Sequence, residues 1–406
     1  MKERSKRRDS GIANKKRAHP YAVHGVISAF FFVATAVFLL FFHSGKTDHL
    51  AEQIGLLLPH GATWVILHLA LWSERTLFLK RRRFAALLLL LFVFTAVAKP
   101  LGGIHSTLIP IPAFVMLVGI LFSARTALIL SLGLLYYVGL VTPIPYSAYL
   151  IVILFGSMTV PRIQLRSHIL IAGLLSGGVL ATYQLAATLQ FGWAIGIELL
   201  YPLLNGLLSA ILAVGLMPLF ESTFSILTPL RLLELSDPNK PLLKRLLMEA
   251  PGTYHHSIMV GNLAETAAHN IGADEILTRV AAYYHDVGKL ERPLYFKENQ
   301  FHIPNPHDTM PPRISAEYIK SHMTYGIGLL QAARIPREII EVVASHHGTS
   351  LIKYFYHKEK SQNPQVDIAD FVYPGPKPRS KEAVILMLAD SIEAAVRSER
   401  MATTDE

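Results

Sequence analysis

Long apolar segments dominate the first half of the chain. Val23–Phe42 is a nearly uninterrupted apolar run, long enough to cross a bilayer as a helix. Further apolar runs lie at roughly 54–72, 84–98, 108–124, 126–141, 146–160, 168–189 and 194–219. The pattern therefore predicts a polytopic transmembrane region over residues 23–220 with about eight spans. Because Pro143 and Pro145 occupy the link between two of the runs, a re-entrant hairpin over 126–160 is an alternative.

The second half has a different pattern. Residues 221–250 form a leucine-rich stretch broken by Pro238 and Pro241, which we interpret as a juxtamembrane linker. From residue 251 to 406, apolar residues recur with helical period, and glycine and proline interrupt them. Alternating runs of the β type are almost absent. The predicted fold class is therefore all-α, a polytopic transmembrane helix bundle followed by an all-helical domain.

The charges support a membrane region. Residues 1–220 hold 18 Lys and Arg against 6 Asp and Glu, whereas residues 221–406 hold 20 against 23. The basic excess thus lies in the apolar half, which favours a lipid bilayer over a nucleic acid polymer as partner. Only 17% of all residues are charged, against about 25% in a typical soluble protein. The chain has no cysteine, which excludes disulfides and thiolate metal sites.

The basic residues also predict an orientation. With a cytoplasmic basic tail over residues 1–22, eight alternating spans place 16 of the 18 Lys and Arg of residues 1–220 on the inner side. Only Lys46 and Lys99 lie outside. An even number of spans returns the chain to the cytoplasm near Leu219. We therefore expect a multi-pass protein whose N-terminus and C-terminal domain are both cytoplasmic.

A few ionisable residues, His60, His68 and Glu198, lie in or beside the predicted spans. Such residues are functional candidates by default, but helix packing or an interfacial position is the favoured interpretation. They form no charged pathway, which argues against a transporter with a regulatory C-terminal domain.

Polar residues interrupt apolar rows in the C-terminal domain. The predicted rows are His256–Val260–Leu263–Ala267 and Ala383–Met387–Asp390–Ala394. His346 and His347 follow a third apolar face. A buried carboxylate is costly unless it is paired or bound to a cation. Histidines and carboxylates that converge without cysteine suit iron, manganese or zinc.

The pair His285–Asp286 is a stronger signal than any single inward histidine. A histidine beside an aspartate offers one nitrogen ligand and one carboxylate whose two oxygens can bridge two metals. We expect a helix over 275–287 to end at Gly288. This turn would place Lys289 at the mouth of the site.

These residues resemble the HD-domain metal phosphohydrolase superfamily. His256, His285–Asp286 and Asp390 match its defining pattern, and His322 with His346–His347 matches its two-metal branch. More closely, the domain resembles the membrane-anchored HD-domain phosphodiesterases that hydrolyse cyclic di-AMP in bacteria. The resembling stretches are Pro251–Ser257, Tyr283–Lys289, Asn305–Asp308, His346–Thr349, Tyr373–Pro378 and Leu388–Ala394.

The resemblance implies a ligand set for two divalent transition metals, iron or manganese. His256, His285, Asp286 and Asp390 would hold one metal, and Asp286, His322, His346 and His347 the other. Asp286 would bridge them and, with Lys289, serve catalysis. A bridging hydroxide would attack phosphorus and give 5′-pApA, while Lys289 offsets phosphate charge. Candidate contacts to the cyclic dinucleotide substrate are Lys289, His307, Lys377, Arg397 and Tyr254.

The chain also departs from the family pattern. Members usually carry a large extracellular domain where this chain has only residues 43–52, and further helices after the motif at Asp390–Arg397. We therefore expect an HD domain over 251–406 that is shortened at its C-terminal end.

Other functions remain open. One is an HD hydrolase of another nucleotide, such as cyclic di-GMP, and a second is a non-catalytic nucleotide-binding membrane receptor. The expected location is the bacterial inner membrane. The sequence leaves the oligomeric state open, including a homo-oligomer.

Overall fold

The computed structural model describes residues 20–43, 50–72, 81–192, 196–300 and 303–402. These residues are mostly helical, and among them the one β pairing is an antiparallel bridge between Leu351 and Val372. The all-α fold class is confirmed. The chain divides into two compact units, residues 1–228 and 229–406. Of the predicted basic tail over 1–22, residues 1–19 lie outside the described residues.

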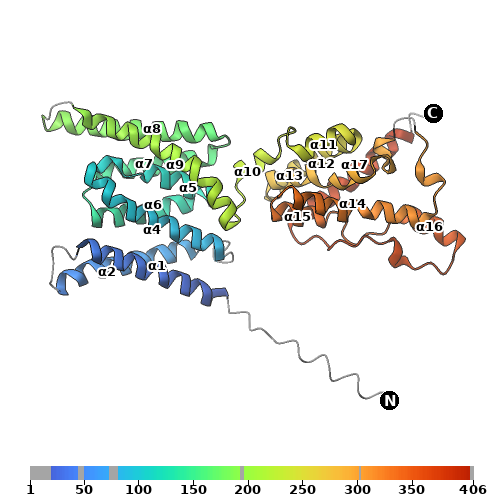
Figure 1. The fold of residues 1–406 in the computed structure, drawn as a ribbon, viewed down its shortest axis with the longest axis horizontal. Coiled ribbons are helices and arrows are strands. Elements are labelled where there is room, and N and C mark those ends of the chain that lie inside the picture. The colour runs from blue at the N-terminus through green and yellow to red at the C-terminus, as the bar shows by residue number, and fades with distance from the viewer. Residues whose placement is uncertain (1–19, 44–49, 73–80, 193–195, 301–302, 403–406) are drawn as a thin grey trace, which may run out of the picture. The chain divides into compact units, whose positions relative to one another are not determined.

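Each of the eight predicted apolar runs overlaps one helix of the first unit (Figure 1). The helices are α1 (Pro20–His43), α2 (Leu50–Trp72), α4 (Arg81–Ile104), α5 (Ile111–Leu121), α6 (Ala124–Val141), α7 (Tyr146–Thr159), α8 (Arg166–Gln190) and α9 (Leu200–Phe224). Six of them, all but α5 and α7, are long and apolar enough to cross a membrane. The 11 residues of α5 extend about 17 Å, less than the roughly 30 Å of a bilayer core. The number of crossings stays a prediction.

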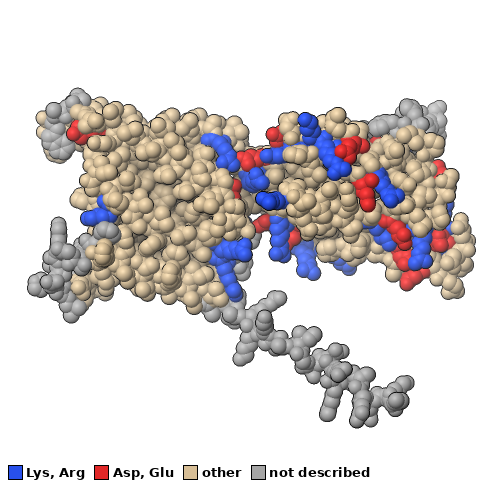
Figure 2. Space-filling view, in the orientation of Figure 1, with Lys and Arg blue, Asp and Glu red and all other residues tan. Residues whose placement is uncertain are grey.

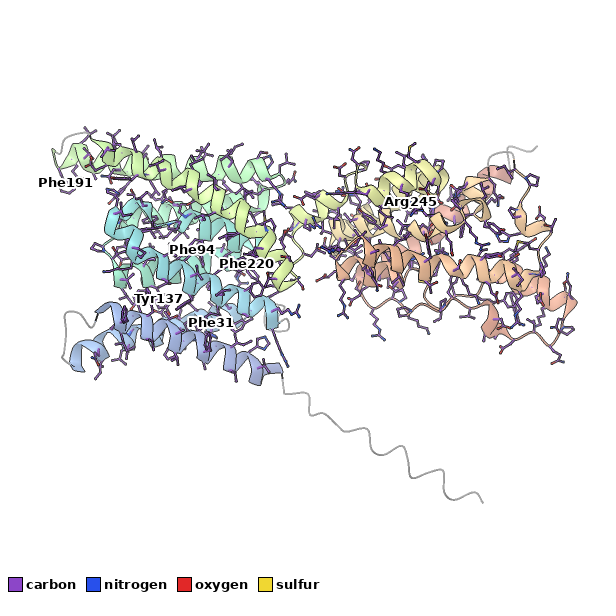
Figure 3. All side chains as sticks on the ribbon, in the orientation of Figure 1. Phe31, Phe94, Tyr137, Phe191, Phe220 and Arg245 are labelled. Atoms are coloured by element: carbon purple, nitrogen blue, oxygen red, sulfur yellow. The ribbon has the colours of Figure 1, made fainter. Side chains whose placement is uncertain are left out.

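The surface of this unit matches a lipid environment. In Figure 2 the face built by α1–α9 is almost free of Lys, Arg, Asp and Glu. Phe94 and Tyr137, labelled in Figure 3, are buried among the helices at 5% and 0% exposure. The unit thus has an apolar exterior around a packed interior, as expected of a membrane bundle.

Polar side chains in the first unit donate hydrogen bonds to the backbone carbonyl oxygens between α4 and α5. Asn205 of α9 donates from Nδ2 to the carbonyl oxygens of Thr107 and Ile109, at 2.7 and 2.9 Å. The Tyr149 hydroxyl of α7 donates to the carbonyl oxygen of Ser106 at 2.9 Å. Because hydrocarbon offers no partner for free peptide groups, non-helical backbone persists at membrane depth only where protein provides one.

α1 and α2 pair through polar and aromatic side chains. Ser28 Oγ lies 2.7 Å from His68 Nε2 and accepts a hydrogen bond from Trp64 Nε1 at 3.1 Å. The Phe32 and His60 rings stack with their centroids 4.6 Å apart. These contacts agree with the helix-packing interpretation of both histidines.

The second unit is a cluster of shorter helices. They are α10 (Pro229–Leu235), α11 (Pro241–Glu249), α12 (Pro251–Asn270), α13 (Glu275–Tyr284), α14 (Pro312–Ala332), α15 (Arg337–Ala344), α16 (Lys353–Gln362) and α17 (Lys381–Ala402). Four of these helices begin with proline, which is preorganised for the first helical position. The stretch predicted as a linker contributes α10 and α11 to this unit.

The buried face of α12 differs partly from the predicted row. His256 and Val260 are buried, as expected, and Ala264 continues the buried row. Leu263, however, is 44% exposed, and Ala267 is also exposed. α12 packs against both α13 and α17, so its inner face follows steps of four residues. In α17, Asp390 is buried but Ala394 is exposed.

Candidate metal centre

Seven histidine and aspartate side chains converge in the second unit. They form two groups, Asp286–His322–His346–His347 and His256–His285–Asp390, and within each group the candidate ligand atoms all lie within 4.8 Å of one another. These are the seven residues that the sequence nominated. They come from α12, the end of α13, α14, the segment after α15, and α17, so distant parts of the chain build the site.

Asp286 belongs to the first group but directs one oxygen to the histidines of each group. Its Oδ2 is 3.1 Å from His285 Nε2 and 3.5 Å from His256 Nε2. Its Oδ1 is 3.6 Å from His322 Nε2 and 3.9 Å from His346 Nε2. The side chain is 1% exposed. This carboxylate therefore has the geometry required to serve both groups at once.

Backbone carbonyl groups orient three of the imidazoles. The Nδ1 atoms of His285, His322 and His346 each contact the carbonyl oxygen three residues earlier, at Ala282, Ile319 and Val343. An Nδ1–H that donates to a carbonyl leaves the lone pair on Nε2. The three Nε2 atoms therefore present lone pairs toward Asp286.

The donor set fits metal ions. The Nε2 atoms of His285, His322 and His346 and Oδ1 of Asp286 are buried without a hydrogen-bond partner among the described residues, whereas Asp286 Oδ2 has Lys289 Nζ at 2.7 Å. Buried polar atoms rarely lack partners, and these atoms converge on shared positions. Imidazole nitrogens and carboxylate oxygens are ligands for iron, manganese and zinc. Divalent cations would satisfy the orphaned atoms.

The electrostatics divide the imidazoles. Burial would lower the pKa values of His256 and His285, but neighbouring carboxylates raise both while no metal is bound, that of His285 to about 10. Burial lowers the pKa of His346 to about 3 and also lowers the pKa values of His322 and His347. Burial alone would raise the pKa of Asp286, but His285 and Lys289 hold it well below its usual value. Neutral imidazole and ionised carboxylate are the forms that coordinate a metal.

Gly288 allows the segment with Asp286 to approach α14. The α13 helix ends at Tyr284, earlier than predicted, and a 3₁₀ helix, η4 (Val287–Glu291), follows. A Cβ on Gly288 would lie 1.8 Å from the His322 carbonyl oxygen. Only glycine permits this approach without displacing backbone, so Gly288 brings Asp286 beside His322.

Tyr373 forms a wall beside His347. Its ring stacks on the imidazole with the centroids 4.2 Å apart. The bridge between Leu351 and Val372, and a 3.0 Å hydrogen bond from Tyr373 N to the Ser350 carbonyl oxygen, hold the two segments together. The segment after His347 thus returns to cover the site.

The sequence analysis placed Lys289 at the mouth of the site, but this prediction is wrong because the side chain is buried. It is 9% exposed, and its Nζ is 2.7 Å from Asp286 Oδ2 and 2.6 Å from Glu298 Oε1. Burial would lower the pKa of Lys289, but the two carboxylates raise it. The 3₁₀ turn after Asp286 folds Lys289 inward, where its charge offsets those of both acids.

The other predicted substrate contacts lie outside the two ligand groups. His307 is buried, with its Nε2 2.9 Å from the Tyr295 carbonyl oxygen. Arg397 Nη2 is 3.6 Å from Glu393 Oε2. Lys377 is exposed and Tyr254 half-buried. Their contacts to substrate stay predictions.

Sequence reasoning missed two acids at the centre. Glu393 contacts His256 Nδ1, and Glu298 pairs with Lys289. Glu393 lies three residues after Asp390 and so shares its helix face, a spacing that could have identified it. Glu298 lies in a segment of short 3₁₀ turns, where no periodic pattern reveals which side chain turns inward.

Comparisons with known proteins agree with this geometry. The model of the family described as "7TM receptor with intracellular HD hydrolase" matches residues 54–228, and the HD domain model matches residues 253–395. The chain belongs to the membrane-anchored HD-domain family. The first match contains α4–α9 and nearly all of α2. The second contains all seven residues of the two ligand groups.

The chain is similar to named relatives over part of their length. It is 44% identical to the cyclic-di-AMP phosphodiesterase PgpH of Bacillus subtilis over 305 residues, which are 72% of this chain and 43% of the relative. It is 53% identical to the protein of the same name from Listeria monocytogenes over 198 residues, 49% of this chain and 28% of the relative. The chain thus spans less than half the length of these relatives.

A solved structure also matches. The crystal structure of the L. monocytogenes PgpH HD domain in complex with cyclic-di-AMP is 53% identical in sequence, with a TM-score of 0.39. The match covers 40% of this chain and 76% of that chain.

Proposed function

We propose that this chain is a membrane-anchored, metal-dependent phosphodiesterase that hydrolyses cyclic di-AMP to 5′-pApA at a two-metal centre. The observation that carries the proposal is the position of Asp286, whose two oxygens face two separate groups of histidines. The names of two relatives support the substrate, since both are cyclic-di-AMP phosphodiesterases.

The ligand assignment follows the two groups. His256, His285, Asp286 and Asp390 would hold one metal, and Asp286, His322, His346 and His347 the other. With nitrogen and oxygen donors only, iron or manganese is the proposed metal pair. When bound, two such ions supply positive charge to the phosphodiester and an activated water for attack on phosphorus.

The protein's own groups organise this chemistry. Carbonyl contacts at Nδ1 fix the ring orientations of His285, His322 and His346 before any ligand arrives, so little reorganisation is needed. Lys289 holds Asp286 at 2.7 Å and keeps it ionised. Because Lys289 is already paired with two acids, its proposed role in catalysis acts through Asp286, and a direct phosphate contact requires one of these pairs to open.

The proposed orientation places the N-terminus and the HD domain in the cytoplasm of a bacterial cell, with the domain beneath the inner membrane. Support comes from the distribution of Lys and Arg over the predicted loops. A cytoplasmic domain would have access to an intracellular cyclic dinucleotide.

The deciding experiment measures products. The purified full chain is incubated with Mn²⁺ or Fe²⁺ and with cyclic di-AMP or cyclic di-GMP, and the products are separated by chromatography. We expect 5′-pApA from the adenine dinucleotide and near-total loss of turnover in Asp286→Ala. Asp237→Ala removes an exposed aspartate and is the matched control, expected to match wild type.

Any one of three results would contradict the proposal. Unchanged turnover by Asp286→Ala would reject the assignment of Asp286 as the bridging carboxylate. Tight binding of cyclic di-AMP by the wild type without any hydrolysis in either metal would instead identify a receptor, and preferred cleavage of cyclic di-GMP would identify a different hydrolase.

A further inference from the structure

His256 is held differently from the three histidines whose Nδ1 atoms contact their own local carbonyl groups. Its Nδ1 contacts the carboxylate of Glu393, on a helix 137 residues further along the chain. The imidazole is 2% exposed and the Glu393 side chain 14% exposed. An acid therefore replaces the local carbonyl as the hydrogen-bond acceptor for this ring.

This contact determines what His256 offers on its other side. A proton on Nδ1 that is donated to Glu393 leaves a lone pair on Nε2. That atom is 3.1 Å from Asp390 Oδ1 and 3.5 Å from Asp286 Oδ2, which are themselves acceptors when ionised. Three acceptors this close repel one another unless a proton on Nε2 or a metal ion lies among them, and a bound metal would take the place of that proton.

The surroundings keep Glu393 in place. Glu393 and Asp390 lie three residues apart on α17, so both face α12, where His256 is located. On the solvent side, Arg397 Nη2 is 3.6 Å from Glu393 Oε2, and the Arg397 side chain is 30% exposed. Arg397 thus has a partner in the protein that accounts for its position without a substrate phosphate.

We propose that Glu393 is a positioning residue that selects the orientation and tautomer of His256 for one of the two metals, the one held by His256, His285 and Asp390. The inference rests on the two-metal centre of the proposed function. A carboxylate behind a ligating imidazole orients the ring and raises its basicity, and loss of such a partner typically weakens metal binding 10–100-fold.

The inference predicts an asymmetric defect. The other group binds through His322 and His346, whose Nδ1 atoms contact backbone carbonyl groups, and so does not depend on Glu393. Removing the Glu393 charge should weaken the binding of one metal and leave the affinity for the other unchanged. A role in helix packing alone would lower stability without distinguishing between the two metals.

The test is a metal titration of the purified full chain. Calorimetry with Mn²⁺, combined with elemental analysis after desalting, gives the number of ions and their affinities. Wild type should bind two Mn²⁺ per chain. Glu393→Gln, which keeps the shape and an acceptor oxygen but removes the charge, should bind one as before and the second at least 10-fold more weakly. Its metal-free unfolding temperature should equal that of the wild type.

Glu265→Gln is the matched control, because Glu265 is a part-buried acid on α12 that pairs with Arg279 and contacts neither ligand group. It should bind both ions as the wild type does. Should Glu393→Gln fail to fold, Glu393→Asp provides a second variant, since its shorter side chain draws the carboxylate away from Nδ1. It should weaken the same single site.

The outcomes separate the two proposals. Two ions bound with wild-type affinity in a folded Glu393 variant would overturn the positioning role. Equal weakening of both ions would do so too, because it would point to a general structural effect. Failure of the wild type to bind two ions would instead refute the two-metal centre itself.

Discussion

Gly288 and the backbone of His322 lie so close that a Cβ on Gly288 would be 1.8 Å from the His322 carbonyl oxygen and 2.7 Å from Gly326 N. Both obstructing atoms belong to the backbone of α14, which cannot yield as a flexible side chain could. The distance between two ligand-bearing segments is thus set by the absence of a single methyl group.

Gly288→Ala is therefore expected to separate η4 from α14. Overpacking of a tight interior costs about 1–3 kcal/mol, and Asp286 would move away from His322. We expect a lower unfolding temperature and loss of bound metal, measured by calorimetry and elemental analysis. Gly328→Ala on the same helix is the control. It meets nothing within 4 Å and should stabilise the protein by up to about 1 kcal/mol. Wild-type metal content in Gly288→Ala would contradict the prediction.

Lys289→Met should leave two buried carboxylates without the ammonium group that pairs with both of them. Asp286 and Glu298 are 1% and 7% exposed, and breaking a buried pair by removing one partner costs on the order of 3–5 kcal/mol. We expect this loss in chemical denaturation of the metal-free protein. The double variant Lys289→Met/Glu298→Gln should recover part of it, because one uncompensated charge is gone. An unchanged free energy of unfolding for the single variant would show that the pairing contributes nothing.

Removal of metal should destabilise the HD domain. The orphaned Nε2 and carboxylate atoms lose their partners, and binding linkage predicts about 2.7 kcal/mol of stabilisation at a free metal concentration 100 times Kd. Differential scanning calorimetry after chelation should show a lower transition temperature, restored by Mn²⁺ or Fe²⁺. Asp286→Ala should show no metal-dependent shift of this size. An equal metal-dependent shift of the transition temperature in that variant would show that the stabilising metal binds away from Asp286.

Labelling can test the orientation of the membrane region, because the chain has no native cysteine. Ser147, near the start of α7, and Gln164, in the segment between α7 and α8, are both exposed. With an inner N-terminus and eight crossings, Ser147→Cys faces outward and Gln164→Cys inward. A membrane-impermeant maleimide applied to intact cells should modify only the first. Modification of Gln164→Cys alone would reverse the proposed orientation.

Apolar length and helical period predicted the membrane unit well, since hydrocarbon imposes one requirement on every residue of a span. All eight runs overlap a helix, including the pair interrupted by Pro143 and Pro145. The sequence did not reveal that α5 has only 11 residues and is wholly buried. An apolar run looks the same whether lipid or protein surrounds it.

At the metal centre, residue type was more informative than local position. The family motifs nominated all seven side chains of the two groups, and the structure brings them together. Period alone misplaced Leu263, because two neighbouring helices determine which face of α12 is covered. The inward turn of Lys289 was also missed. Its partner Glu298 lies in a segment of short 3₁₀ turns, where no periodic sequence pattern shows which side chain points inward.

The two ligand groups are completed at different points of the chain. Asp286, His322, His346 and His347 all precede residue 348, whereas the second group needs Asp390 of α17. A nascent polypeptide whose α17 is still inside the ribosome lacks one ligand of the second group. Binding of a metal by the group of His256, His285 and Asp390 would therefore require α17 to have been translated and packed.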